Sequence, residues 1–191
     1  AQASTGMAPA LTGIVGGRPK PSPVIKLFSF LVDKSSLKVE VDIHGERHLV
    51  QIPAGSPVHT QTLPAGEVAE FKGDEIEVPL VKVAHARSGD KGNYSNIGVI
   101  ARRAEFLPWI RASLTEAKVA EYMKHVFEGA SDAQANQVKR YEIPGFHALN
   151  FLLLDALGGG GVASLRIDPQ GKAFAQQLLD MPVKVPAALL N

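Results

Sequence analysis

Side chains that bind anions or move protons are crowded into one stretch near the middle of the chain, His85-Ala-Arg-Ser-Gly-Asp-Lys-Gly-Asn-Tyr-Ser-Asn96. Glycine adopts positive φ without steric cost, so the glycines of this stretch can form a tight turn that points several backbone N–H groups at one spot. Cationic side chains beside such a turn favour a phosphate or a carboxylate. The sequence therefore predicts an anion site, with the candidate binding residues Arg87, Ser88, Gly89, Asp90, Lys91, Gly92, Asn93 and Asn96.

The same turn also has a structural interpretation, in which Asp90 accepts backbone N–H bonds and pairs with Lys91 or Arg102. Because so many polar side chains lie close together in this stretch, we favour a functional site. His85 precedes the turn and is the only candidate general base, although a hydrogen-bonded structural role is commoner for such a histidine. No Walker A spacing is present, and no nucleophile motif surrounds Ser88. The sequence leaves open the reaction type and whether the chain is an enzyme.

Asn150 is a further candidate binding residue. It interrupts the apolar stripe of a predicted helix that starts at Pro144 and ends at the glycines 158–161. A buried amide needs hydrogen-bond partners. Asn150 can therefore face the anion site, or it can hold the 87–93 turn in place, which is the interpretation that we favour.

Arg166, Asp168 and Lys172 form a third polar group, at the end of a strand predicted over 162–167. A surface salt-bridge cluster is the default interpretation of such a group. The alternative is that these residues supply the second half of an anion site, completed across a subunit interface.

The residue pattern gives little support to metal or cofactor chemistry. His44 and His48 are four apart but flank a predicted hairpin turn, so we expect exposed hairpin residues rather than metal ligands. The chain has no cysteine, which excludes disulfides, thiolate catalysis, zinc ribbons and iron–sulfur clusters. We therefore expect no metal and no cofactor.

Charge and hydropathy exclude two classes of partner. The net charge is +1 and the basic residues are scattered, which gives no electrostatic case for nucleic acid. No apolar run approaches the roughly 18 residues that a membrane span needs. The start of the chain has no signal-peptide pattern. We expect a cytoplasmic protein without nucleic-acid or membrane partners.

Three regions follow one another along the chain. Residues 1–23 are rich in Gly and Pro and predict an extended arm or linker. Residues 24–76 predict a β-rich segment with a hairpin, the tail of a larger upstream domain, and loop residues place its boundary near 73–77. Residues 77–191 predict one further domain.

Hydrophobic periodicity predicts strands first and then an alternation of strands and helices. Apolar and charged residues alternate over 37–43, as in a strand with one buried face, and a following glycine turns this strand into a hairpin. Helices are predicted after Ser113 or Thr115, from Pro144, and over 170–179. These elements suggest an α+β sandwich with helices on one face of the sheet. The predicted strands are 24–32, 37–43, 47–52, 77–86, 95–102, 137–143, 162–167 and 183–185.

Six separated blocks stand in order along the chain: Gly17-Arg-Pro-Lys-Pro-Ser-Pro-Val24, Leu27-Phe-Ser-Phe30, Arg87-Ser-Gly-Asp-Lys-Gly-Asn93, Asn96-Ile-Gly-Val-Ile-Ala-Arg102, Ala148-Leu-Asn-Phe151 and Ser164-Leu-Arg-Ile-Asp-Pro-Gln-Gly-Lys172. Together they resemble the C-terminal region of the acyclic terpene utilisation (AtuA-like) family. The resemblance spans nearly the whole chain and implies a ferredoxin-like fold for about residues 77–187. Family members are much longer, which implies a missing N-terminal domain. The family is associated with the breakdown of branched acyclic terpenoid acids, as CoA thioesters, and the resemblance brings no catalytic residues.

Two functions are compatible with these observations. In the first, the chain is the C-terminal part of an enzyme of terpenoid or branched acyl-CoA catabolism, and residues 87–96 bind acyl-CoA or another anionic small molecule. The missing domain or another subunit would complete that site. In the second, the chain is a non-catalytic module for oligomerisation or domain docking, and the polar turn is a structural latch. A sheet covered on one face readily pairs through the other, so we expect a homo-oligomer.

Overall fold

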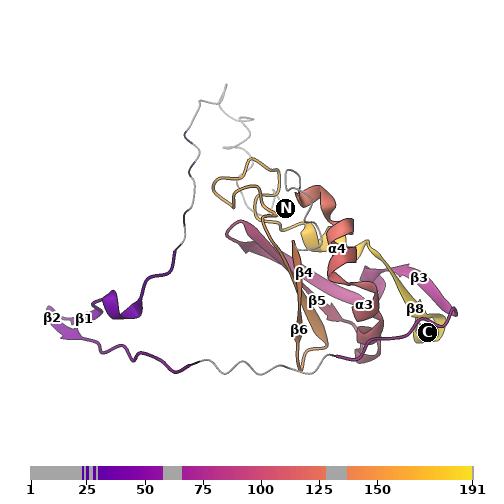
Figure 1. The fold of residues 1–191 in the computed structure, drawn as a ribbon, viewed down its shortest axis with the longest axis horizontal. Helices are drawn as coiled ribbons and strands as arrows, with labels where there is room; N and C mark the ends of the chain where they lie inside the picture. Colours follow the sequence, from indigo (N-terminus) through magenta and orange to yellow (C-terminus); the bar gives the residue numbers. More distant parts are fainter. Residues whose placement is uncertain are drawn as a thin grey trace. The chain divides into compact units, whose positions relative to one another are not determined.

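The computed structural model describes residues 23, 25, 28, 30–57, 66–127 and 137–190 (Figure 1). Two compact units are distinguished, Phe28–Ala65 and the remainder of the chain. They divide N-terminal to the boundary predicted near 73–77. The arm predicted over residues 1–23 lies outside the described residues, except for Pro23.

The smaller unit contains the predicted hairpin. A short 3-10 helix, η1 (Lys34–Ser36), precedes β1 (Glu40–Ile43), which pairs antiparallel with β2 (Glu46–Leu49). Every residue of both strands is exposed, so the prediction of a half-buried strand is wrong. Residues 30–33 have no regular structure, in contrast to the strand predicted over 24–32.

The larger unit is built on an antiparallel four-stranded sheet in the order β4-β5-β7-β6. Its strands are β4 (Ala84–Lys91), β5 (Tyr94–Ala101), β6 (Val138–Ile143) and β7 (Ala148–Leu153). A second sheet pairs β3 (Glu75–Pro79) with β8 (Pro182–Pro186). The single strand predicted over 77–86 is therefore split between two sheets. The 3-10 helix η2 (Leu80–Lys82) separates its halves, and it buries Leu80 in the core.

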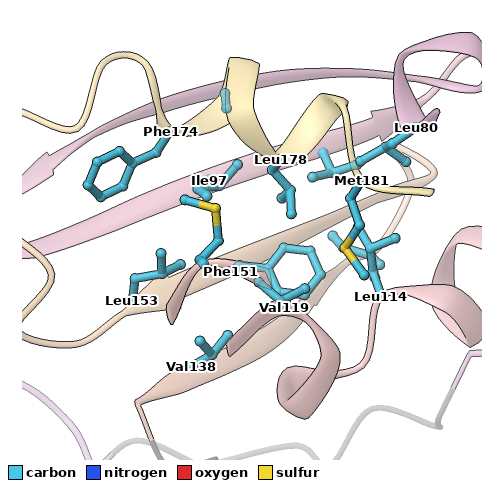
Figure 2. Packing of buried hydrophobic residues seen from close by; sticks show 14 of the residues in the cluster. Leu80, Ile97, Leu114, Val119, Val138, Phe151, Leu153, Phe174, Leu178 and Met181 are labelled. Atoms are coloured by element: carbon cyan, nitrogen blue, oxygen red, sulfur yellow. The ribbon is translucent and has the colours of Figure 1, made fainter. Parts of the chain in front are cut away.

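The helices of this unit share one hydrophobic core with one face of the four-stranded sheet. Figure 2 shows Val119, Leu178, Ile97 and Phe151 meeting there, from two helices and two strands. This is an α+β arrangement with the helices on one face, as predicted. The helices are η3 (Ala104–Phe106), α3 (Leu107–Ser113), α4 (Glu116–Tyr122), η4 (Lys124–Phe127), α5 (Phe174–Leu179) and η6 (Ala187–Leu190).

Ser113 and Thr115 were the two alternative caps predicted for one helix, and the structure distinguishes between them. The Thr115 side chain accepts a hydrogen bond from the N–H of Lys118 at 3.2 Å and caps α4. Ser113 is instead the last residue of α3, and its Oγ accepts a bond from the N–H of Lys184 at 3.3 Å. Both hydroxyls satisfy backbone donors, but only Thr115 does so at a helix start.

The helix predicted from Pro144 is wrong, because this segment is the turn and second strand of the β6–β7 hairpin. Gly145 and His147 have positive φ in the turn. Buried and half-buried residues then alternate along β7, whereas a helical stripe would recur every three or four residues. In so short an apolar run the two periodicities cannot be told apart from sequence.

The strand predicted over 162–167 is also wrong. These residues form turns and bends, and Leu165 and Ile167 are 90% and 80% exposed. The glycines 158–160 before them have positive φ and start this irregular loop rather than ending a helix. This segment pairs with none of the described strands, and an apolar run alone does not make a strand.

Candidate functional site

The predicted anion turn is in fact the end of a β-hairpin. Residues Ser88 to Lys91 belong to β4, so their N–H groups do not converge as a nest. The turn itself consists of Gly92, with φ of 66°, and Asn93. Because side chains alternate along a strand, the predicted binding residues are distributed over the two faces of the sheet.

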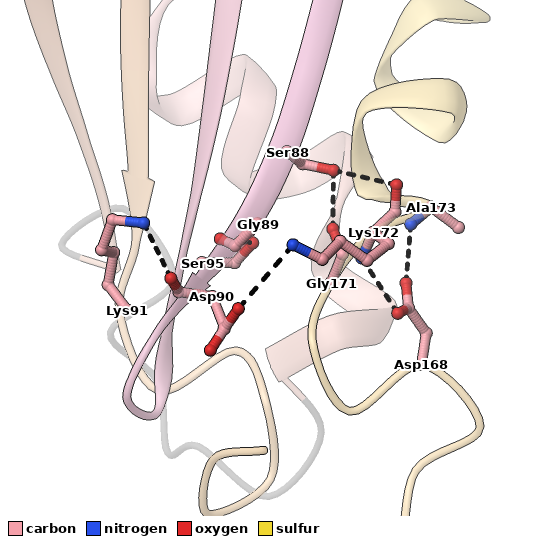
Figure 3. Close-up of polar contacts among 9 residues, drawn as sticks. All are labelled: Ser88, Gly89, Asp90, Lys91, Ser95, Asp168, Gly171, Lys172 and Ala173. Atoms are coloured by element: carbon pink, nitrogen blue, oxygen red, sulfur yellow. Dashed lines mark hydrogen bonds and ion pairs between the residues drawn. The ribbon is translucent and has the colours of Figure 1, made fainter. Parts of the chain in front are cut away.

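Ser88 faces the core and is engaged in structural bonds. Its Oγ donates to the carbonyl of Gly171 at 2.6 Å and accepts from the N–H of Ala175 at 2.9 Å. The residue is buried. The hydroxyl therefore joins β4 to the start of α5. Figure 3 shows it between the carbonyls of Gly171 and Lys172. Because its proton is donated to a carbonyl oxygen, no base takes it up in this arrangement.

Lys172 reaches the same strand from the loop before α5. Its Nζ lies 3.9 Å from Oδ1 of Asp90. The carboxylate of Asp168 holds this loop by accepting the N–H groups of Lys172 and Ala173 at 2.9 and 2.8 Å (Figure 3). A Cβ added to Gly89 would lie 3.3 Å from the Lys172 Nζ, so glycine leaves space here for the ammonium group.

These groups border a depression over the edge strand β4, which we call the polar hollow, of about 340 Å³. It contains three cationic side chains and one carboxylate. Lys91 donates from Nζ to the carbonyl of Asp90 at 2.8 Å. Within the described part of the chain, the Arg87 guanidinium forms no hydrogen bond and no ion pair. The polar hollow is lined by Arg87, Ser88, Gly89, Asp90, Lys91, Asn96, Gly98 and Lys172.

Asn96 and Asn150 contact each other on neighbouring strands, since Nδ2 of Asn96 lies 3.2 Å from Oδ1 of Asn150. Asn150 is on β7 and not on a helix, and it pairs in register with Gly98. Asn96 lines the polar hollow, whereas Asn150 is not among its lining residues. The bond of Asn150 is therefore to β5 and not to the 87–93 turn that we expected it to hold.

Asn93 and Gly92 do not line the polar hollow. The Asn93 amide donates to Oδ1 of Asp155 at 2.9 Å and accepts from the N–H of Gly159 at 2.7 Å. These bonds fasten the β4–β5 turn to the loop after β7. The interpretation of the turn as a structural latch therefore applies to Asn93. The cationic side chains nearby take no part in these bonds.

A second depression, the apolar hollow, adjoins the first and was not predicted from the sequence. It has a volume of about 440 Å³. The alternation in 148–153 is the sequence signal that bears on it, but only the strand register pairs Ala148 with Ile100 and places both on one face. The apolar hollow is lined by His85, Ala86, Arg87, Gly98, Val99, Ile100, Ile143, Phe146 and Ala148.

His85 is in contact with Arg102, whose Nη1 lies 3.1 Å from its Nε2. A guanidinium only donates, so Nε2 accepts this bond and the ring proton is on Nδ1. While this contact holds, Nε2 cannot take a proton from a substrate. His85 therefore contributes a polar side chain to the lining of the apolar hollow. In this arrangement its Nε2 is not available as a general base.

The remaining candidate groups do not assemble into a site. Arg166 donates to the carbonyls of Val126 and Ala156, so the predicted salt-bridge cluster with Asp168 and Lys172 is not formed. The described residues contain no group of three His, Asp or Glu placed to hold a metal ion. In the same part of the chain, no helix is long and apolar enough to cross a membrane. His44 and His147 lie in hairpin turns, and His48 lies on β2 opposite Val41.

The sequence profile of the AtuA ferredoxin-like domain matches residues 78–184, from β3 to β8. No curated protein and no solved structure matches the chain. The matched residues make up more than half of the chain and include the four-stranded sheet with both hollows. This chain belongs to the family defined by the AtuA ferredoxin-like domain.

Proposed function

We propose that this chain binds an anionic small molecule in the polar hollow, as part of an AtuA-like protein of acyclic terpenoid or branched acyl-CoA catabolism. One observation carries the proposal: Arg87, Lys91 and Lys172 gather around one depression in which Asp90 is the single carboxylate. Folding alone gains little from bringing three cations together, since like charges repel. An anion placed among them gains charge-assisted hydrogen bonds.

The chemistry of the hollow fits a carboxylate or a phosphate. Arg87 offers a planar fork that binds either group through two parallel bonds, and the lysines add mobile point charges. Asn96 supplies an amide at the border. Acyl-CoA carries phosphates and a terpenoid acid carries a carboxylate, so both ligand classes present a group that this site accepts.

Binding, rather than chemistry, is the contribution that these residues support. The Ser88 hydroxyl is held between Gly171 and Ala175, and Nε2 of His85 accepts a bond from Arg102. Neither group is an activated nucleophile or a base in this arrangement. In our proposal, another domain or subunit supplies the reacting groups over the hollow.

A role in oligomerisation or domain docking is the second candidate function. The outer face of the four-stranded sheet, opposite the core, exposes large apolar side chains, of which Tyr141 is 51% exposed. Its charged residues, however, are Arg87, Lys91 and Lys139, with no carboxylate among the strand positions of this face. Two copies stacked through this face would oppose like charges, which favours an anionic partner over a second copy.

Calorimetric titration of the chain with phosphate, citrate, CoA and isovaleryl-CoA tests the proposal. We expect saturable binding of at least one of these anions. The Arg87→Ala and Lys91→Ala variants should each weaken it about 10- to 100-fold, because a hydrogen bond to a charged group contributes about 1.5–3 kcal/mol. Lys139→Ala is the matched control, since it removes a cation of the same face that does not line the hollow.

The melting temperature separates binding from stability. Arg87 and Lys91 are exposed, so their variants should melt within a few degrees of the wild-type chain. Absence of binding by all four anions, or equal weakening by Lys139→Ala, would contradict the proposal. A large loss of stability in the Lys91→Ala variant without any anion effect would instead support the docking function.

A further inference from the structure

Gly98 is a glycine that the fold itself does not require. It lies in the middle of β5, an inner strand of the four-stranded sheet. Glycine weakens a strand interior because it costs more conformational entropy and packs no side chain. Its φ is not among the positive values of the described residues, so an L side chain fits the backbone. An added Cβ would meet no atom nearer than 3.9 Å, so packing does not demand glycine either.

The position of Gly98 gives a reason why this residue has no side chain. Gly98 lies between Arg87 on β4 and Asn150 on β7 in the register of the sheet. Arg87 and Gly98 are the two residues that line both the polar and the apolar hollow. On the same face of β5, Asn96 borders the polar hollow and Ile100 borders the apolar one. A side chain at Gly98 would stand as a partition between them.

We propose that one ligand occupies both hollows, with its anionic group at Arg87 and an apolar chain that crosses the bare backbone of Gly98. The chain then contacts Ile100, Ile143 and Phe146. This inference rests on the proposed function, since it extends the anion site by the place of the apolar part. It identifies the ligand class as a carboxylate or acyl derivative with an attached hydrocarbon chain. Unsubstituted anions would fill half of the site.

Charge and exposure support such an occupant. Phe146 and Ile100 are 65% and 40% exposed, so a hydrocarbon chain laid over them removes apolar surface from water. The cations lie at one end of the paired hollows, and the apolar residues lie at the other. A ligand that is polar at one end and apolar at the other matches both ends, whereas a uniformly charged polymer or an uncharged lipid matches one.

The test compares acetate with octanoate, which share a carboxylate and differ in the apolar chain. Binding to the wild-type chain and to Gly98→Val is measured by titration, with ¹⁵N amide shifts of β5 as the readout. We expect octanoate to bind wild type at least tenfold more tightly than acetate, because burial of about two methylene groups already gives that factor. Gly98→Val should abolish this preference, so that octanoate binds no more tightly than acetate.

Two further variants define the site. Ile100→Gln makes the apolar hollow polar on the same strand and should also weaken octanoate but not acetate. Tyr94→Val, on the same face of β5 but outside both hollows, should change neither affinity. Circular dichroism and melting temperature verify that each variant is folded.

The outcomes separate this inference from the proposed function. If wild type binds acetate and octanoate equally, or if Gly98→Val keeps the octanoate preference, the spanning ligand is disproved while the anion site stands. If wild type binds neither carboxylate and none of the anions above, the proposed function fails and the inference fails with it. Loss of acetate together with octanoate in Gly98→Val would also overturn the inference, because the variant would then damage the polar hollow itself.

Discussion

Two glycines of the β4–β5 hairpin illustrate how differently one residue type acts at neighbouring positions. Gly92 has a φ of 66° in the turn, which L side chains rarely adopt. Gly98 lies in the strand with ordinary extended geometry. Neither glycine would be crowded by a methyl group, because no atom lies within 4 Å of an added Cβ at Gly92 and the nearest one at Gly98 is 3.9 Å away. Backbone conformation alone therefore separates them.

Alanine substitution should consequently have opposite effects at these two positions. Gly98→Ala should raise the free energy of unfolding by about 0.5–1 kcal/mol, because glycine is unfavourable within a strand. Gly92→Ala should lower it by about 1–2 kcal/mol, the cost of a left-handed conformation. Urea denaturation of both variants measures these changes. A destabilised Gly98→Ala variant would mean that the fold does need glycine there, which would weaken the argument for a ligand.

Single polar groups also change their meaning with their contacts. Ser88 and His85 have the residue types of a nucleophile and a base, and they lie close together in sequence. The structure turns Ser88 to the core and His85 to the outer face. Their bonds to α5 and to Arg102 occupy the atoms that catalysis would use. Arg87, which lies between them in the sequence, forms no hydrogen bond and no ion pair within the described part of the chain.

At the scale of single elements, β3 begins with Glu75, whose carboxylate binds the backbone of the residues just before the strand. Glu75 accepts the N–H of Lys72 at 2.6 Å and the N–H of Gly73 at 2.9 Å. These hydrogen bonds, chiefly that from Lys72, hold the pKa of Glu75 below its ordinary value of 4.5. The ionised form is the one that folding favours. The strand thus starts from a turn closed by its own first residue.

The contribution of Glu75 to stability should depend on pH with a definite sign. Because the folded pKa is lowered, this contribution is fully present above about pH 4.5 and is lost as the pH falls through the folded value. Glu75→Gln should therefore melt below wild type at pH 7. The difference should shrink below pH 4.5 and vanish in stronger acid. Glu70→Gln is the control, and a pH-independent difference for Glu75→Gln would contradict the assignment.

On the scale of the whole molecule, one buried arginine joins segments that are distant in sequence. Arg111 on α3 donates to both carboxylate oxygens of Glu142 on β6, at 2.9 Å each, and also to the carbonyl of Glu67. Its side chain is 6% exposed and that of Glu142 is 30% exposed. Arg111 thus connects the segment before β3, the helix α3 and the edge strand β6 of the four-stranded sheet.

Removal of this arginine should destabilise the larger unit strongly. Arg111→Met leaves the Glu142 carboxylate half-buried and unpaired, and we expect a loss of about 2–4 kcal/mol, below the 3–5 typical of fully buried pairs. Glu142→Gln and the double variant complete a cycle measured by urea denaturation. Lys124→Met, which breaks an exposed pair with Glu121, should cost under about 1 kcal/mol. Additive losses in the cycle would show that the two residues act independently.

Local sequence signals alone predicted several elements correctly. The β1–β2 hairpin, β6, α5 and β8 all match segments predicted from periodicity and turn residues. The ferredoxin-like fold also agrees with the prediction, which came from resemblance. These elements share signals that act within a few residues, such as a glycine turn or a strand between polar residues. Such signals need no knowledge of distant contacts.

Tertiary structure decided every feature that depends on contacts between residues distant in the sequence. The sequence by itself determined the α+β class and brought Arg87, Lys91 and Asn96 together, because they are close along one hairpin. It could not determine that Asn150 lies on a strand, since a six-residue apolar run satisfies both periodicities until a sheet accepts it. It also could not place Lys172 beside Asp90, or join two hollows at Gly98. Those arrangements follow from strand register and from the packing of α5, and only the folded chain sets both.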